Sequence, residues 1–206
     1  MASGAHAAEV RLAVGSNTGP AMDAVVSLHG TVPSSTRTAT ARMDQQHSAF
    51  VPGVLPVQAG TVVAFPNRDN IQHHVYSFSQ PRQFEIPLYS GNKAAPIRFD
   101  KPGVVVVGCN IHDWMIGHIV VLDTPYFGKT GTDGKLSLEV PPGRYTLRVW
   151  HVRGNGAPLE RTLDVPAAGA SATLQVSLAP VKSEVRGNDR LRSLQEKFRQ
   201  AKGGTP

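Results

Sequence analysis

The segment Gly103-Val104-Val105-Val106-Val107-Gly108-Cys109-Asn110-Ile111-His112-Asp113-Trp114-Met115 is the stretch that decides the fold of this chain. A nearly continuous valine run that ends in glycine is typical of a strand buried on both faces. Such a strand carries Cys109, the single cysteine of the chain, to one end of a β-structure. His112 and Met115 follow three and six residues later. Thiolate, imidazole and thioether are soft donors, and together they favour copper over magnesium or calcium.

A second histidine must come from another part of the chain, because a blue-copper site has one Cys and two His in a plane with a weak axial Met. The segment from Phe65 to Tyr76 supplies His73 and His74. Both segments resemble a cupredoxin, and the short Cys-x2-His-x2-Met loop resembles that of amicyanin. In that family the first histidine ligand stands six residues after an Asn-Arg pair, a spacing that Asn67-Arg68 and His73 keep. The resemblance covers about residues 43–122 and implies a Greek-key β-sandwich.

The resemblance also implies a ligand set and a function. One type 1 copper would be held by His73, Cys109, His112 and Met115, with Asn67, His74 and Asn110 around these ligands. Asn67 is expected to hydrogen-bond across to the loop around Asn110. A single copper that cycles between Cu(II) and Cu(I) suits an electron-transfer protein and not an enzyme. The alternatives are a copper storage or delivery protein, a zinc site, a Cys–His nucleophile, and a β-sandwich binding module without redox activity.

The ligand loop departs from the amicyanin pattern at Ile111, where a Pro is usual, and at Asp113-Trp114, where the family has Pro-Phe. These changes keep the ligand types and alter the surface around them. His112, ringed by Ile111, Trp114 and Ile116, is the expected electron port and docking patch for a redox partner protein. Likeness to amicyanin does not by itself assign the amicyanin partner.

A second unit is indicated by turns at Thr132-Asp133-Gly134 and Pro141-Pro142-Gly143, between stretches that alternate as strands do. This pattern resembles a carboxypeptidase regulatory-like (transthyretin-like) β-sandwich, which normally opens with a Gly-x-Pro segment and a strand. Gly19-Pro20 and residues 24–28 fit that opening. We therefore expect residues 9–30 and 124–179 to form one small sandwich, interrupted by a cupredoxin domain over residues 40–123. Two contiguous domains with extra N-terminal strands are the alternative.

Composition agrees with an all-β chain. The 206 residues are 40% hydrophobic and 17% charged, with 20 Gly and 16 Pro, which favours a globular, turn-rich protein of short strands. One cysteine excludes an internal disulfide. No apolar run approaches the roughly 20 residues of a membrane helix, and no motif with base-stacking aromatics indicates nucleic-acid binding.

The two ends of the chain differ from the rest. Ala5-His6-Ala7 fits the small-x-small pattern before a signal-peptidase site, so residues 1–8 are interpreted as an export-signal remnant, which implies the periplasm; a disordered tip is the alternative. Residues 180–206 carry seven Lys or Arg against three acids. Asp189 could cap a short amphipathic helix that bears Leu191, Leu194 and Phe198. This basic tail could contact a membrane surface or an acidic partner, or remain a solvated helix.

Overall fold

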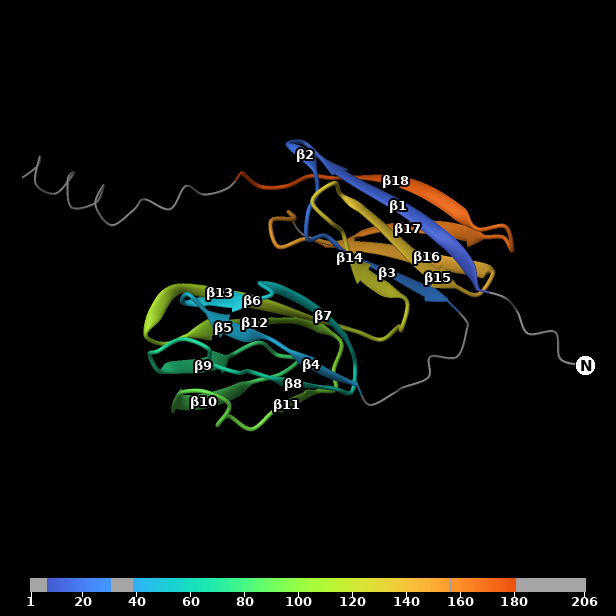
Figure 1. Ribbon diagram of the computed structural model, residues 1–206. Coiled ribbons are helices and arrows are strands. Elements are labelled where there is room, and N and C mark those ends of the chain that lie inside the picture. Colours follow the sequence, from blue (N-terminus) through green and yellow to red (C-terminus); the bar gives the residue numbers. More distant parts are fainter. Residues whose placement is uncertain (1–6, 31–38, 156, 181–206) are drawn as a thin grey trace, which may run out of the picture.

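The computed structural model describes residues 7–30, 39–155 and 157–180, and within them every regular element is a β-strand (Figure 1). The predicted all-β class is therefore confirmed. The predicted C-terminal helix, almost all of the basic tail and most of the predicted export segment lie outside the described residues. In the part of the chain that the structure describes, no helix is long and apolar enough to cross a membrane.

Ten strands between residues 40 and 122 form what we call the inserted sandwich. One sheet has the order β10-β9-β12-β13-β7, a second has β11-β8-β4, and β5 and β6 form a separate hairpin. Neighbours that are distant in sequence give this part a Greek-key arrangement. The bounds are β4 (Thr40–Arg42), β5 (Asp44–Gln46), β6 (Ala49–Val51), β7 (Val54–Gln58), β8 (Thr61–Ala64), β9 (His73–Ser77), β10 (Phe84–Tyr89), β11 (Ile97–Phe99), β12 (Gly103–Cys109) and β13 (His112–Leu122).

The valine strand β12 is buried on one face only, so the prediction of burial on both faces is wrong. Val105, Val107 and Cys109 point into the core between the two sheets, whereas Val106 is 43% exposed. The reason is the layer structure. The strand lies between β9 and β13, both antiparallel to it, in a sheet whose outer face is covered only in part. The valine run therefore reflects strand propensity as much as burial.

Eight strands before and after the inserted sandwich pair with one another and form what we call the split sandwich. Its sheets have the orders β15-β1-β18, with β2 on β1, and β14-β3-β16-β17. Ala8 is 2% exposed and pairs with Val140, so it belongs to this sandwich rather than to the expected export remnant or disordered tip. The bounds are β1 (Ala8–Ser16), β2 (Gly19–Pro20), β3 (Val25–Gly30), β14 (Phe127–Lys129), β15 (Lys135–Val140), β16 (Gly143–Trp150), β17 (Leu159–Val165) and β18 (Ala170–Val176).

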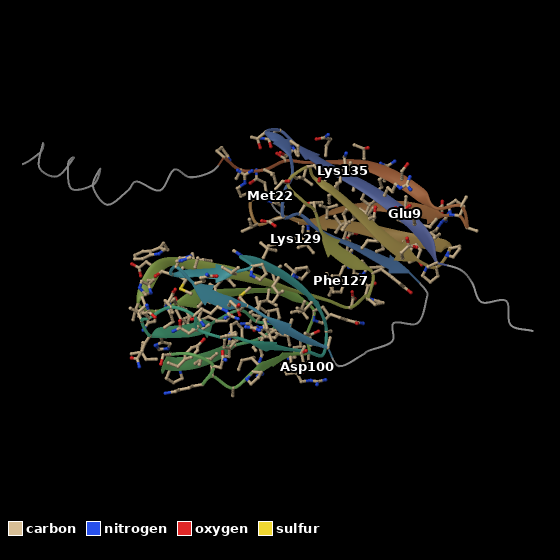
Figure 2. The ribbon with its side chains drawn as sticks, in the orientation of Figure 1. Glu9, Met22, Asp100, Phe127, Lys129 and Lys135 are labelled. Carbon is tan, nitrogen blue, oxygen red and sulfur yellow. The ribbon has the colours of Figure 1, made fainter. Side chains whose placement is uncertain are left out.

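The two sandwiches contact each other through a small apolar cluster. Figure 2 shows Phe127 and Lys129 on the side of the split sandwich that faces the inserted sandwich, and Lys129 Nζ lies 3.4 Å from the carbonyl oxygen of Val54. The rings of His118 and Trp150 pack with their centroids 5.8 Å apart. These contacts lie around one cluster, which comprises Val25, Val54, Val120, Leu122 and Trp150.

Candidate metal centre

Three strands deliver the predicted ligands to one end of the five-stranded sheet. His73 is the first residue of β9, Cys109 is the last of β12, and His112 is the first of β13. Cys109 pairs with Val75 on one side and with His112 on the other, where the register shifts. Only Asn110 and Ile111 separate the two strands of this hairpin, so the spacing of Cys109 and His112 is fixed by a tight turn.

The donor atoms converge on one point. The Sγ atom of Cys109 lies 3.6 Å from Nδ1 of His73 and 3.6 Å from Nδ1 of His112, and the three ligand atoms lie within 4.8 Å of one another. Bonds of about 2.1 Å to nitrogen and 2.3 Å to sulfur, opened by about 110–120°, separate two donors by about 3.6–3.8 Å. The observed spacing therefore fits a metal ion held between the three atoms.

Most of the ligand side chains are buried. His73 is 0% and Cys109 is 3% exposed, while the ring of His112 is only partly covered. Met115 is 1% exposed and belongs to the same core cluster as Cys109 and Val75. A buried thiolate, two imidazole nitrogens and a neighbouring thioether form a soft donor set of the kind that copper prefers.

Asp69 is a site residue that was not predicted from the sequence. Its Oδ2 lies 2.8 Å from Nε2 of His73, the nitrogen that faces away from Cys109. The backbone N–H of His47 donates to Oδ1 at 2.6 Å and that of Ser48 to Oδ2 at 2.9 Å. Burial alone would raise the pKa of Asp69, but the hydrogen bonds from Ser48, His73 and His47 lower it below the ordinary value. The ionised carboxylate therefore fixes the His73 ring with Nδ1 turned toward the sulfur.

The turn that binds Asp69 has an unusual backbone. His47 and Ser48 connect β5 to β6 and have φ angles of 55° and 52°. Two successive residues with positive φ are typical of a type I′ hairpin turn. Because both N–H groups donate to Asp69, this turn is tied to the ligand segment. A carboxylate four residues before His73 was the available sequence signal, but nothing local indicated the turn that holds it.

Asn67 is buried, as expected of a residue beside the ligands, but it makes different bonds from those predicted. Its amide nitrogen donates to the carbonyl oxygens of Ile71 at 2.8 Å and Tyr89 at 3.0 Å, and its oxygen accepts from the N–H of Asp69 at 2.9 Å. Both amide hydrogens are thus used within the segment before His73 and on β10. Asn67 shapes that segment instead of reaching the loop around Asn110.

The link between the two ligand segments comes from the main chain. The N–H of Asn110 donates to the carbonyl oxygen of His74 at 3.0 Å. The side chain of His74 points elsewhere, with Nε2 2.8 Å from Oε1 of Glu85. His74 and Asn110 therefore join the segments through backbone atoms, which no side-chain pattern could reveal.

A buried polar group lies on the strand beside His73. Tyr89 pairs with His73 in the sheet, and its hydroxyl donates to the carbonyl oxygen of Phe65 at 2.6 Å. The amide nitrogen of Gln45 donates to the same carbonyl at 3.2 Å and to the Tyr89 hydroxyl. Burial raises the pKa of Tyr89 to about 12; the hydrogen bond from Gln45 lowers it and the neighbouring Cys109 raises it further. Tyr89 is therefore a neutral donor that joins β10 to Phe65, the residue directly after β8.

The fold and the donor set define a class of protein: a β-sandwich with a buried Cys-His-His soft-metal centre at one end. No protein-family model and no curated protein matches the chain.

Among solved structures the chain is similar to a purple cupredoxin from Nitrosopumilus maritimus, with 21% identity, 40% of this chain and 99% of that chain covered, and a TM-score of 0.36. It is also similar to a Cu-containing nitrite reductase from Thermus scotoductus SA-01, with 25% identity, 46% of this chain and 25% of that chain covered, and a TM-score of 0.39. For a reduced variant of amicyanin the identity is 19%, the coverage is 47% and 98%, and the TM-score is 0.38. The assignment of the site therefore depends on its own donors and geometry.

Proposed function

We propose that this protein is an electron carrier with one type 1 copper ion, held by His73, Cys109, His112 and Met115. The observation that carries the proposal is the convergence of the Cys109 sulfur with Nδ1 of two histidines, each at 3.6 Å, in a site with a buried methionine nearby. Bound copper would supply a one-electron couple between Cu(II) and Cu(I). Zinc is disfavoured because a methionine thioether is not one of its usual ligands.

The protein residues would keep the ligands in one arrangement. Asp69 orients the ring of His73, and the hairpin turn at Asn110 and Ile111 fixes His112 relative to Cys109. Cys109 and Met115 lie in the apolar core, which excludes water from the sulfur donors. A site that needs little rearrangement suits the exchange of single electrons, because both oxidation states can share one geometry.

We further propose that a redox partner protein docks around His112. The ring of Trp114 packs edge-on against His112 with centroids 5.2 Å apart. Ile111, Trp114 and Ile116 are 49%, 63% and 55% exposed. Apolar side chains gathered beside a partly covered ligand ring are typical of an interaction surface. The partner would thus approach His112, because of the two histidine rings in the described site this is the one that is not buried.

The proposal is tested by adding Cu(II) to the purified apoprotein and recording visible absorption and EPR, beside a Cys109→Ser control. We expect an intense charge-transfer band and narrow copper hyperfine splitting, both lost in the control. Voltammetry should then show a reversible one-electron couple. A colourless protein that retains zinc would refute the copper assignment. Copper that passes rapidly to a chelator without reversible cycling would indicate delivery instead of electron transfer.

The periplasmic setting is likewise a proposal, and its support is the Ala5-His6-Ala7 pattern alone. Fractionation of cells that express the full-length gene, with the mature N-terminus read by mass spectrometry, tests it. A protein that stays in the cytoplasm with its N-terminus intact would contradict it.

A further inference from the structure

A second polar cluster lies where the two sandwiches meet. Ser27 and His29 are two residues apart on β3, so their side chains share one face of that strand. Ser27 Oγ lies 2.9 Å from Nε2 of His29, and Nδ1 of His29 lies 2.9 Å from Oδ1 of Asp123. Asp123 follows directly after β13, whereas the ligand His112 begins it. The length of that strand, about 30 Å, therefore separates this cluster from the metal centre.

Hydrogen-bond chemistry fixes the protons in this cluster. A carboxylate can only accept, so Nδ1 of His29 must carry the hydrogen that faces Asp123. In the neutral ring Nε2 is then an acceptor, and the Ser27 hydroxyl donates to it. This is the arrangement of a hydroxyl nucleophile, a general base and an orienting carboxylate. Asp123 lies far from Ser27 and His29 in the sequence, which is why no local motif indicated the cluster.

The cluster opens into a cavity of about 190 Å³ between the two sandwiches. Ser27, His29 and Asp123 all line it. Most of the remaining lining is apolar and includes Val104, Val120 and Trp150. Ligand sites of drug size usually span about 300–1,000 Å³, so this cavity suits only a small molecule.

Arg148 supplies a positive charge at the same place. It lies directly opposite Ser27 in the antiparallel pair of β16 and β3, and it also lines the cavity. Side chains at such paired positions on one face start about 5 Å apart. Its Nε lies 2.7 Å from Oε1 of Glu160, and in this ion pair the guanidinium keeps its charge. A cation beside the serine can stabilise negative charge that develops on a substrate oxygen.

We propose that Ser27, His29 and Asp123 form a nucleophilic site that hydrolyses small esters in the cavity between the sandwiches. The Ser27 oxygen would attack the ester carbonyl while Nε2 of His29 takes its proton. Arg148 would stabilise the oxygen anion, and His29 would return the proton to the departing alcohol, which leaves an acyl-serine. Water then attacks the acyl group with His29 again as base, which releases the acid and restores the hydroxyl.

The His29 ring is in the neutral state that a general base requires. Burial lowers the pKa of His29; the carboxylates of Asp123 and Glu160 act in the opposite direction, and Arg148 lowers it further. The ring is therefore neutral at neutral pH and free to accept a proton. A purely structural role is the alternative, in which the same hydrogen bonds only join β3 to the connection between the sandwiches. Thr124 does this already, because its hydroxyl donates to the carbonyl oxygen of Leu28 at 2.7 Å.

A fluorophosphonate probe separates the two roles, because it reacts with activated serines and not with ordinary ones. The serine oxygen bonds to phosphorus, fluoride leaves, and the proton passes to His29. The full chain should carry Cys109→Ala, so that neither a free thiol nor a hydroxyl beside His73 can react, and a second sample should keep Cys109 with copper loaded. Mass spectrometry then locates the modified peptide. We expect one label per chain, at Ser27. This readout needs no substitution in the cavity.

Turnover is measured with p-nitrophenyl acetate in the same background. Ser27→Ala and Asp123→Asn should each lower the rate of hydrolysis by at least about 100-fold. The control is Ser171→Ala, which removes an exposed serine on β18 and should leave the rate unchanged. Circular dichroism checks that each variant is folded. The absence of a label at Ser27, or a rate that Ser27→Ala leaves unchanged, would overturn the proposal and leave the cluster as a structural link.

Discussion

Replacing Asp69 by Asn removes one negative charge beside the metal centre and preserves the shape of the side chain. The carboxylate lies 2.8 Å from Nε2 of His73, one imidazole ring away from the donor Nδ1. An ion bound at Nδ1 would be about 6–7 Å from it, where one unit charge interacts by about 2.5 kcal/mol at an effective dielectric constant of about 20. Because Cu(II) and Cu(I) differ by one charge, we expect the reduction potential to rise by about 100 mV.

Loss of the hydrogen bond behind His73 is expected to change the potential by a similar amount. Loss of a hydrogen-bond partner behind a metal ligand typically weakens metal binding by about 10–100-fold. If that loss falls mainly on Cu(II), it raises a one-electron potential by about 60–120 mV. The direction follows from charge, since the carboxylate favours the more positive oxidation state.

Protein-film voltammetry on the wild type and Asp69→Asn measures the shift, and Asp100→Asn is the matched control. Asp100 is an exposed acid paired with Arg98, at the end of the inserted sandwich where β12 begins (Figure 2). The length of β12 places it about 20 Å from Cys109, so its charge should be largely screened and move the potential by less than about 20 mV. An equally small shift in Asp69→Asn, with the copper spectrum intact, would refute the role given to Asp69.

Three further predictions concern other parts of the molecule. Tyr89→Phe removes a buried hydroxyl that donates to Phe65, so urea titration should show a loss of about 1–2 kcal/mol in unfolding free energy; an unchanged midpoint would contradict this. Burial lowers the pKa of His118, so the unfolded chain binds more protons near pH 6.5 and stability should rise with pH through that range, falling as pH drops below it. His118→Gln should flatten this dependence between pH 5.5 and 7.5, and an unaltered slope would assign it to other groups. Trp114→Ala should leave the copper spectrum unchanged and slow electron exchange with a partner at least about fivefold, as loss of about 1 kcal/mol of docking energy requires; stopped-flow rates equal to wild type would exclude docking at this patch.

The part of the site that the sequence predicts is the part that local structure fixes. Cys109, His112 and Met115 lie within one short stretch, and a β-hairpin with a two-residue turn keeps Cys109 beside His112. His73 could be chosen over His74 because its spacing from Asn67 matched a known family. The structure turns the His73 ring toward Cys109 and the His74 ring toward Glu85, on the opposite face, as alternation along a strand requires.

What the sequence could not predict depends on segments that meet only in the folded chain. Asp69 acquires its role from a turn at His47 and Ser48, about twenty residues earlier, whose N–H groups face it. The Ser27 cluster needs Asp123, which lies on the far side of the inserted sandwich in sequence. The burial of β12 depended on which layers cover its sheet, and a valine run carries no information about that. In each case the missing information is tertiary.

The outer face of β13 explains how two sandwiches can coexist with an accessible metal centre. From Trp114 onward the residues of this strand alternate: odd-numbered residues line the core and even-numbered residues face outward. At the ligand end the outward residues are Trp114 and Ile116, which are exposed. Further along the strand, the outward residues are His118, which packs on Trp150, and Val120, which belongs to the apolar cluster between the two sandwiches. The split sandwich therefore covers the half of this face that is distant from His112. The proposed redox partner would therefore reach His112 without displacing the split sandwich. The second folded unit leaves the surface around the metal ligands accessible.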